Sequence, residues 1–174
     1  SGIDVFPEIL KKKDLIRFND FLIKNNFFLV IKKHPNTFKE DDHRFYNKDS
    51  EKIYKNLNKL EGFFLLDYDV DLNSIIKNCE ILVSDYSGAI FDYLLLGRSI
   101  IFYTPDLKNY KKQPGLYFNL EKLGIGPLVY NIRELMKQLN KNKKDKFYQK
   151  NIAKLRKKIF EKEDCFRNII KIIN

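Results

Sequence analysis

The chain has 174 residues, of which 44% are hydrophobic and 14% aromatic, so it can form one domain with a sizeable buried core. Its formal net charge of +10 suits binding to nucleic acid, to an anionic membrane surface or to anionic substrates. The sequence has no zinc finger, recognition-helix motif or RNA-binding signature, so nucleic acid is not an expected partner. It has no apolar run of membrane-spanning length, no signal-peptide core and only two distant cysteines, which together favour a cytoplasmic protein without disulfides.

The chain begins with a helical pattern followed by a strand. Residues 7–26 carry a broad apolar stripe and predict an amphipathic helix. Residues 27–31, FFLVI, form a continuous apolar run that is typical of a central strand. Pro35 ends this strand and leaves His34 at its carboxyl end, the edge where α/β folds bind ligands. From the residues alone, an ordinary loop histidine is the commoner interpretation.

A polar segment without periodicity, residues 37–50, precedes the next elements. It contains Asp41, Asp42 and His43, but no second group of metal-ligating residues accompanies them, so we expect a solvated loop and no metal or other cofactor. Residues 51–60 predict a short helix and residues 63–66, FFLL, a second strand. Asp71 is the predicted N-cap of a further helix that ends at Lys77.

Residues 79–103 predict a strand, a polar turn, a helix and a second strand. Residues 81–83 are an apolar run, and residues 99–103 are apolar and β-prone. Between them, residues 89–96 predict a helix, and Gly97 follows it as a C-terminal glycine. A unit of this length is a βαβ crossover with parallel strands. The helical side chains predicted to point inward are Ile90, Phe91, Leu94 and Leu95.

The turn of this unit is a candidate anion site. It runs Ser84-Asp85-Tyr86-Ser87-Gly88, and its last two residues fall at the helix N-terminus. Free N–H groups and a partial positive charge at that end suit a phosphate, and Asp92, one turn later, could accept hydrogen bonds from ribose hydroxyls. The residues therefore predict a nucleotide-diphosphate site. The alternative is a capped helix with a tight turn and a solvated carboxylate.

The sequence after residue 103 predicts one more strand and three helices. Gly126 lies in a glycine-rich run before a short strand, where its backbone could approach a phosphate or a base. Helices are expected over 131–140, with Asn131 as the N-cap, and over 145–160 and 164–173. The order of elements predicts an α/β, Rossmann-like parallel sheet with helices on both faces.

We expect a single domain over residues 3–174. Ser1-Gly2 has the form of a remnant of a cleaved expression tag. Basic residues are concentrated in 137–162, so residues 143–174 are expected to form a basic helical tail packed on the domain.

The stretch SDYSGAIFDYLLLGRSIIFY, residues 84–103, resembles the C-terminal signature of the CDP-glycerol glycerophosphotransferases, the teichoic-acid and capsule polymerases. Their pattern is roughly [ST]-D-Y-S-S-x-x-F-D-x-x-x-L-x-K-P-I-I-F-Y. Gly88 replaces the second serine, and Arg98-Ser99 replaces Lys-Pro. The residues that fall on the pattern in register are Asp85, Tyr86, Ser87, Phe91, Asp92, Leu96, Ile100, Ile101, Phe102 and Tyr103.

Other parts of the chain extend the resemblance. His34-Pro35 matches the family's HP dipeptide, which implies that His34 is catalytic, through diphosphate contact or proton management at the leaving group. Tyr110 falls on the family's D-x-x-x-Y and is available for stacking in the donor pocket, and Asn119 stands where the family pattern has Asp. The predicted donor-binding residues are Ser84, Asp85, Ser87, Gly88, Asp92, Tyr110 and Gly126.

The resemblance implies the donor-binding, C-terminal half of a GT-B architecture. Its substrates would be CDP-glycerol or CDP-ribitol and a teichoic-acid-like or capsular polymer acceptor, at the inner face of the cell membrane. The N-terminal GT-B half would be supplied by further sequence, and the fragment alone would be inactive. Two alternatives stay open: a donor domain for a UDP-sugar, and a basic module that binds an anionic membrane or polymer without catalysis.

Overall fold

The computed structural model describes residues 12–32, 54–67, 69–105, 107, 119–142 and 146–160. Contacts within the chain form two compact units, residues 1–74 and residues 75–174, and each is described by itself. Both are α/β with parallel strands, as expected. The single domain over 3–174 and the tail over 143–174 stay predictions, and the expected helix over 164–173 lies outside the described residues.

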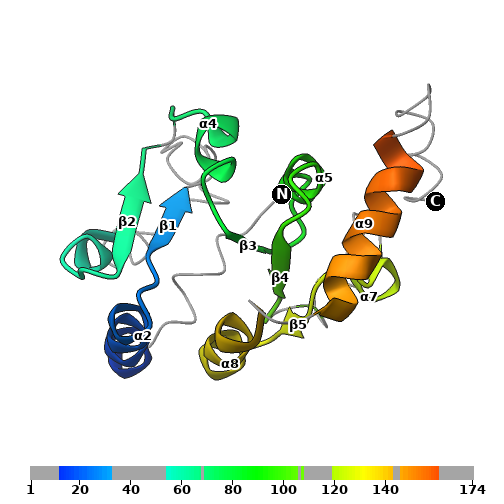
Figure 1. The fold of residues 1–174 in the computed structure, drawn as a ribbon. Coiled ribbons are helices and arrows are strands. Elements are labelled where there is room, and N and C mark those ends of the chain that lie inside the picture. The colour runs from blue at the N-terminus through cyan, green and yellow to red at the C-terminus, as the bar shows by residue number, and fades with distance from the viewer. Residues whose placement is uncertain are drawn as a thin grey trace. The chain divides into compact units, whose positions relative to one another are not determined.

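The first unit is built on two parallel strands, β1 (Leu29–Lys32) and β2 (Phe63–Leu66), which pair with Leu29 opposite Phe63 (Figure 1). Helix α2 (Lys12–Lys24) packs on them through Phe18, whose ring centroid lies 5.8 Å from that of Phe63. The strand predicted over 27–31 begins two residues later than expected, at Leu29.

Helix α2 is also tied to the start of β2 by a buried polar contact. Gly62 donates its backbone N–H to the Asn19 side chain at 3.0 Å. A Cβ on Gly62 would lie 3.0 Å from the same Asn19 oxygen, so the glycine permits this close approach. Of the helix predicted over 51–60, residues 51–53 lie outside the described residues, and residues 54–57 are helical, with Tyr54 and Leu57 buried.

Helix α4 (Leu72–Ile76) begins where the sequence predicts. The Asp71 carboxylate accepts from the backbone N–H groups of Asn73 at 3.2 Å and Ser74 at 3.0 Å, which confirms the N-cap. The helix ends one residue before the expected Lys77.

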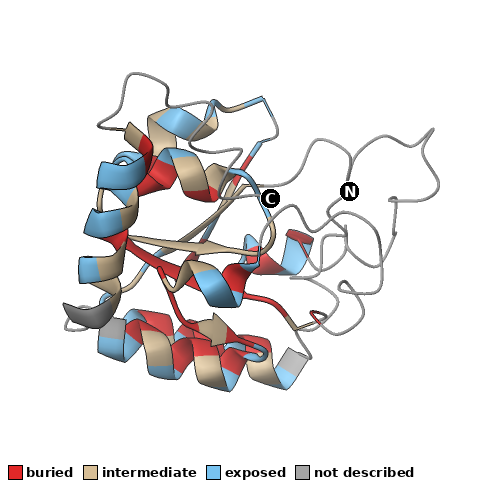
Figure 2. Cartoon of the chain, turned by 90° about the vertical axis from the view of Figure 1, so that its right-hand side faces the viewer, coloured by how far each residue is buried: buried red, intermediate tan, exposed pale blue. Residues whose placement is uncertain are grey.

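The second unit contains a three-stranded parallel sheet in the order β3 (Ile81–Ser84), β4 (Ser99–Tyr103), β5 (Leu128–Val129). Every residue of the central strand β4 is buried, as expected for a strand covered on both faces. In Figure 2 the buried residues, in red, alternate with exposed ones along the helices. These helices are α5 (Ala89–Leu94), α7 (Leu120–Leu123), α8 (Ile132–Asn142) and α9 (Lys146–Phe160).

One part of the prediction for α5 is wrong. Leu95 is 48% exposed, whereas Tyr93 is fully buried beside Ile90 and Leu94. Helical geometry explains the difference, because positions three and four after Ile90 share its face and position five does not. The helix ends two residues earlier than predicted, and Gly97 follows in a left-handed conformation with φ of 65°.

Helices α8 and α9, the last two described, belong to the second unit. Asn131 accepts from the backbone N–H of Glu134 at 3.0 Å, which confirms the predicted N-cap of α8. Helix α9 buries Ile152 and Ile159. It is held by a hydrogen bond from Gln149 to the Ser99 hydroxyl at 3.0 Å. None of the described helices is long and apolar enough to cross a membrane.

Candidate functional site

The candidate site lies at the carboxyl edge of β3 and β4. Ser84, the last residue of β3, pairs with Phe102, so the loop after β3 and the residues after Tyr103 leave the sheet side by side. Ligands of open α/β sheets bind at this edge. Two of the sequence-predicted segments, the 84–88 turn and the start of the loop after β4, therefore meet here.

Local hydrogen bonds shape the loop between β3 and α5. Asp85 Oδ1 accepts from the backbone N–H of Ser87 at 3.0 Å, and Ser87 Oγ accepts from the N–H of Ala89 at 3.3 Å. The carboxylate of Asp85 thus has a turn-forming role. Ser87 and Gly88 are exposed, and the Ser87 hydroxyl can still donate its hydrogen to a ligand.

Gly88 lies at the N-cap of α5 with φ −62° and ψ −17°, which any residue can adopt. A Cβ at this position would meet nothing within 4 Å. The glycine that replaces the family's serine is therefore not required by the backbone, and the space beside it is open.

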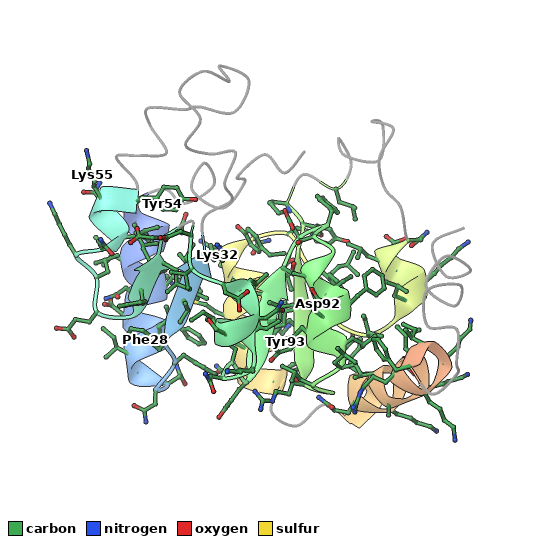
Figure 3. The ribbon with its side chains drawn as sticks, turned by 90° about the horizontal axis from the view of Figure 1, so that it is seen from above. Phe28, Lys32, Tyr54, Lys55, Asp92 and Tyr93 are labelled. Carbon is green, nitrogen blue, oxygen red and sulfur yellow. The ribbon has the colours of Figure 1, made fainter. Side chains whose placement is uncertain are left out.

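Helix α5 has only six residues, so its dipole adds little to anion binding. Asp92 is exposed in its first turn, whereas its neighbour Tyr93 is buried; both are labelled in Figure 3. Among the described residues at this edge, hydrogen-bond donors of the loop such as the Ser87 hydroxyl are the groups that can bind an anion.

Gly126 is needed for packing. A Cβ there would lie 2.3 Å from the Ile100 carbonyl oxygen and 3.3 Å from the Phe102 ring, so only glycine fits against β4. The residue is buried, and its assignment to donor contact stays a prediction.

Two predicted site residues, His34 and Tyr110, lie outside the described residues. Their catalytic and donor-binding roles stay predictions, as do the roles of Ser84, Asp85, Ser87, Gly88 and Asp92. Within the described ranges no three His, Cys, Asp or Glu side chains gather as metal ligands.

Thr104, at this edge, is not among the residues that the sequence predicts for the site. It directly follows β4 and is fully buried, and its hydroxyl has no hydrogen-bond partner. A polar residue directly after a buried strand is the signal that could have drawn attention to it. Burial also raises the pKa of the neighbouring Tyr103 to about 12.

A second cluster lies at the opposite edge of the same strands. Arg98 donates to the Lys77 and Cys79 carbonyl oxygens, each at 2.7 Å, and the Tyr93 hydroxyl donates to the Cys79 carbonyl at 2.9 Å. Burial raises the pKa of the Cys79 thiol, partly offset by the Arg98 charge. This cluster joins backbone segments and favours a neutral thiol, which indicates a structural role.

Known proteins resemble the chain in sequence. It is 29% identical over 129 residues to a teichoic acid ribitol-phosphate primase of Bacillus spizizenii, covering 74% of this chain and 28% of that protein. It is 34% identical over 86 residues to a teichoic acid poly(glycerol phosphate) polymerase of Bacillus subtilis, covering 48% of this chain and 11% of that protein. The chain thus spans less than a third of the length of these relatives.

Solved structures confirm the predicted α/β fold of the GT-B type. The wall teichoic acid polymerase TagF matches 93% of this chain with a TM-score of 0.50 and 20% sequence identity, and this chain covers 47% of that structure. A histidine-to-asparagine variant of TagF matches 92% with a TM-score of 0.54 and 20% identity, again with 47% of its length covered.

A family model matches nearly the whole chain, including both segments of the candidate edge. The model is that of the CDP-glycerol:poly(glycerophosphate) glycerophosphotransferases, and it matches residues 7–171. This chain belongs to that family.

Proposed function

We propose that this chain is the donor-binding part of a transferase that moves glycerol phosphate or ribitol phosphate from its CDP derivative to a growing teichoic-acid-like or capsular polymer. The family match over residues 7–171 carries this proposal. The polar loop at the carboxyl edge of β3 and β4 supports it, because it offers exposed donors where this fold class binds nucleotides.

In the proposed reaction an acceptor hydroxyl oxygen attacks the β-phosphorus of the CDP-alditol, and its proton passes to a base of the second GT-B half. The bond from that phosphorus to the CMP oxygen breaks, and CMP leaves. Ser87 would donate to the diphosphate, and Asp92 would accept from the ribose. His34 would stabilise the charge that builds on the leaving group or give it a proton. No metal ion is needed in this scheme.

The acceptor side of the site would come from a second GT-B half. The chain covers 47% of the TagF structure that it resembles, which leaves room for such a half in a longer protein. We therefore expect the 174-residue chain to bind nucleotide without turning over substrate.

Calorimetric titration with CDP-glycerol, CDP, CMP and UDP tests this proposal. We expect CDP compounds to bind the wild-type chain and to bind Ser87→Ala and His34→Ala about fivefold to tenfold more weakly, since each loses a hydrogen bond to the ligand. Asn140→Ala, on the exposed side of α8, is the control and should bind normally. Equal affinity for UDP would favour a nucleotide-sugar donor instead, and no nucleotide binding would contradict the proposal.

A second function, binding to anionic lipid at the inner membrane face, is favoured by the basic surface of α9. Lys150, Lys154 and Lys158 are exposed on it. We expect the chain to sediment with vesicles containing anionic lipid, to be released by raised salt and to lose binding when these three lysines become glutamine. Equal binding to purely zwitterionic vesicles would refute this second function, which is compatible with the first.

A further inference from the structure

The Thr104 hydroxyl is a polar group that the fold leaves unsatisfied. Thr104 is 0% exposed, and its Oγ1 has no hydrogen-bond partner. Its backbone is satisfied, because its N–H donates to the Val129 carbonyl at 2.8 Å and its carbonyl accepts from Leu107 at 3.2 Å. A buried hydroxyl without a partner destabilises the folded chain, and such groups are uncommon in native proteins.

The position of this hydroxyl relates it to the candidate site. In the parallel pairing of β3 and β4, Ser84 lies opposite Phe102, and Thr104 follows Phe102 by two residues. Continuing that register places Thr104 level with Tyr86, in the loop that leads to Ser87 and Gly88. Neighbouring strands of a sheet are about 4.8 Å apart, so Thr104 borders the proposed donor site.

We propose that Thr104 is a further donor-site residue whose hydroxyl forms a hydrogen bond to the bound nucleotide diphosphate, directly or through one ordered water. The inference rests on the proposed function and adds a residue to it. The hydrogen bond that the free chain lacks is made when the donor binds. This accounts for a threonine where valine, of the same shape, would fill the space without a buried orphan hydroxyl.

Two substitutions separate the hydroxyl from the shape of the side chain. Thr104→Val keeps the branched shape and removes the hydroxyl, whereas Thr104→Ser keeps the hydroxyl and removes a methyl group. The experiment measures CDP affinity by calorimetry and thermal unfolding without nucleotide, on both variants and the wild-type chain.

For Thr104→Val we expect CDP to bind about fivefold to tenfold more weakly, the effect of one lost hydrogen bond. We expect its midpoint of unfolding to stay the same or to rise by about 2–4 °C, because an unsatisfied polar group has been removed. Thr104→Ser should bind CDP within about twofold of the wild type, although its lost methyl group lowers the unfolding midpoint. Weaker CDP binding by Thr104→Val without a loss of stability would not follow from a purely structural role.

Two results overturn the inference. One is CDP binding by Thr104→Val that is as tight as that of the wild-type chain. The other is a Thr104→Val chain that is less stable than the wild type without nucleotide, since lower stability would mean that the hydroxyl already has a partner. Failure of the wild-type chain to bind any nucleotide is a different result: it contradicts the proposed function and this inference with it.

Discussion

At the scale of single residues, the two departures from the family pattern after α5 both have partners in the structure. Arg98 stands where the pattern has lysine and donates to two backbone carbonyls, those of Lys77 and Cys79, at 2.7 Å each. Ser99 stands where the pattern has proline, and its hydroxyl accepts from Gln149 of α9 at 3.0 Å. Both residues therefore fasten the amino-terminal edge of β3 and β4, at the opposite end of these strands from the candidate site.

Replacing Arg98 tests this structural role. Arg98→Ala leaves the Lys77 and Cys79 carbonyls without this donor, and we expect the free energy of unfolding to fall by about 1–2 kcal/mol. Arg98→Lys, the family residue, keeps a charged donor but has a shorter reach and no planar fork, so it should lose less stability than Arg98→Ala. Urea unfolding of the wild type and the two variants measures their free energies of unfolding. An unchanged CDP affinity in both variants is expected, and a large change would contradict a role confined to this edge.

Gly126 and Gly88 make a matched pair of glycines. A Cβ on Gly126 would lie 2.3 Å from the Ile100 carbonyl oxygen, whereas one on Gly88 would meet nothing within 4 Å. Gly126→Ala should therefore lose about 1–3 kcal/mol of stability through overpacking. Gly88→Ala should gain about 0.4–1 kcal/mol, because its backbone is already in a region that alanine favours. Thermal unfolding measures both, and similar effects at the two positions would contradict this account.

The sequence could predict the local part of the candidate site and not its buried part. The turn around Ser87 was found because small polar residues between a strand and a helix form a local signal. The hydroxyl of Thr104 was missed because burial of a side chain depends on what packs over it, which is remote in sequence. The role of Gly126 was missed for the same reason, since its close neighbour Ile100 lies on another strand.

At the scale of elements, strands were predicted more closely than helix ends. The strands over 63–66 and 99–103 match the structure, because continuous apolar runs mark buried parallel strands. Helix α5 ends two residues early because Gly97 already adopts a left-handed conformation and the preceding turn is tightened by i to i−3 hydrogen bonds, such as the one from Leu95 to Asp92. Helix ends depend on such cap geometry, which a hydrophobic period does not encode.

The short helix α7 was not predicted, and its cap is testable. Asn119 precedes it and accepts from the backbone N–H of Lys122 at 3.2 Å. Aspartate, the family residue here, caps equally well, so Asn119→Asp should leave the free energy of unfolding within about 0.5 kcal/mol. Asn119→Ala should lower it by about 1 kcal/mol. Urea unfolding compares the variants, and an equal loss in both would show that the side chain does something other than cap α7.

At the scale of the whole molecule, the chain is a pair of α/β units, each with its own buried interior. Phe18 of α2 and Leu57 are fully buried in the first, and Ile101 and Ile125 in the second. The Rossmann-like character was predictable, because helix and strand patterns alternate along the chain. The division at residue 74 was not, because no change in composition marks it.

Stability of the folded chain should fall at alkaline pH. Burial raises the pKa of Tyr103 from its ordinary value of 10.0 to about 12. Below pH 10 the hydroxyl is protonated in both states, so folding does not change its proton. Between pH 10 and pH 12 the unfolded chain releases the proton and the folded chain keeps it, so the free energy of unfolding decreases as the pH rises.

Tyr103→Phe isolates this contribution from the other groups that titrate in the same range, above all the lysines. Urea unfolding of the wild type and the variant at about pH 8, 9, 10 and 11 measures the slope for each chain on both sides of the ordinary tyrosine pKa. We expect the wild type to lose stability more steeply than Tyr103→Phe above pH 10, while the difference between the two chains stays constant below pH 9. Parallel slopes throughout would mean that the Tyr103 hydroxyl ionises as readily in the folded chain as in the unfolded one.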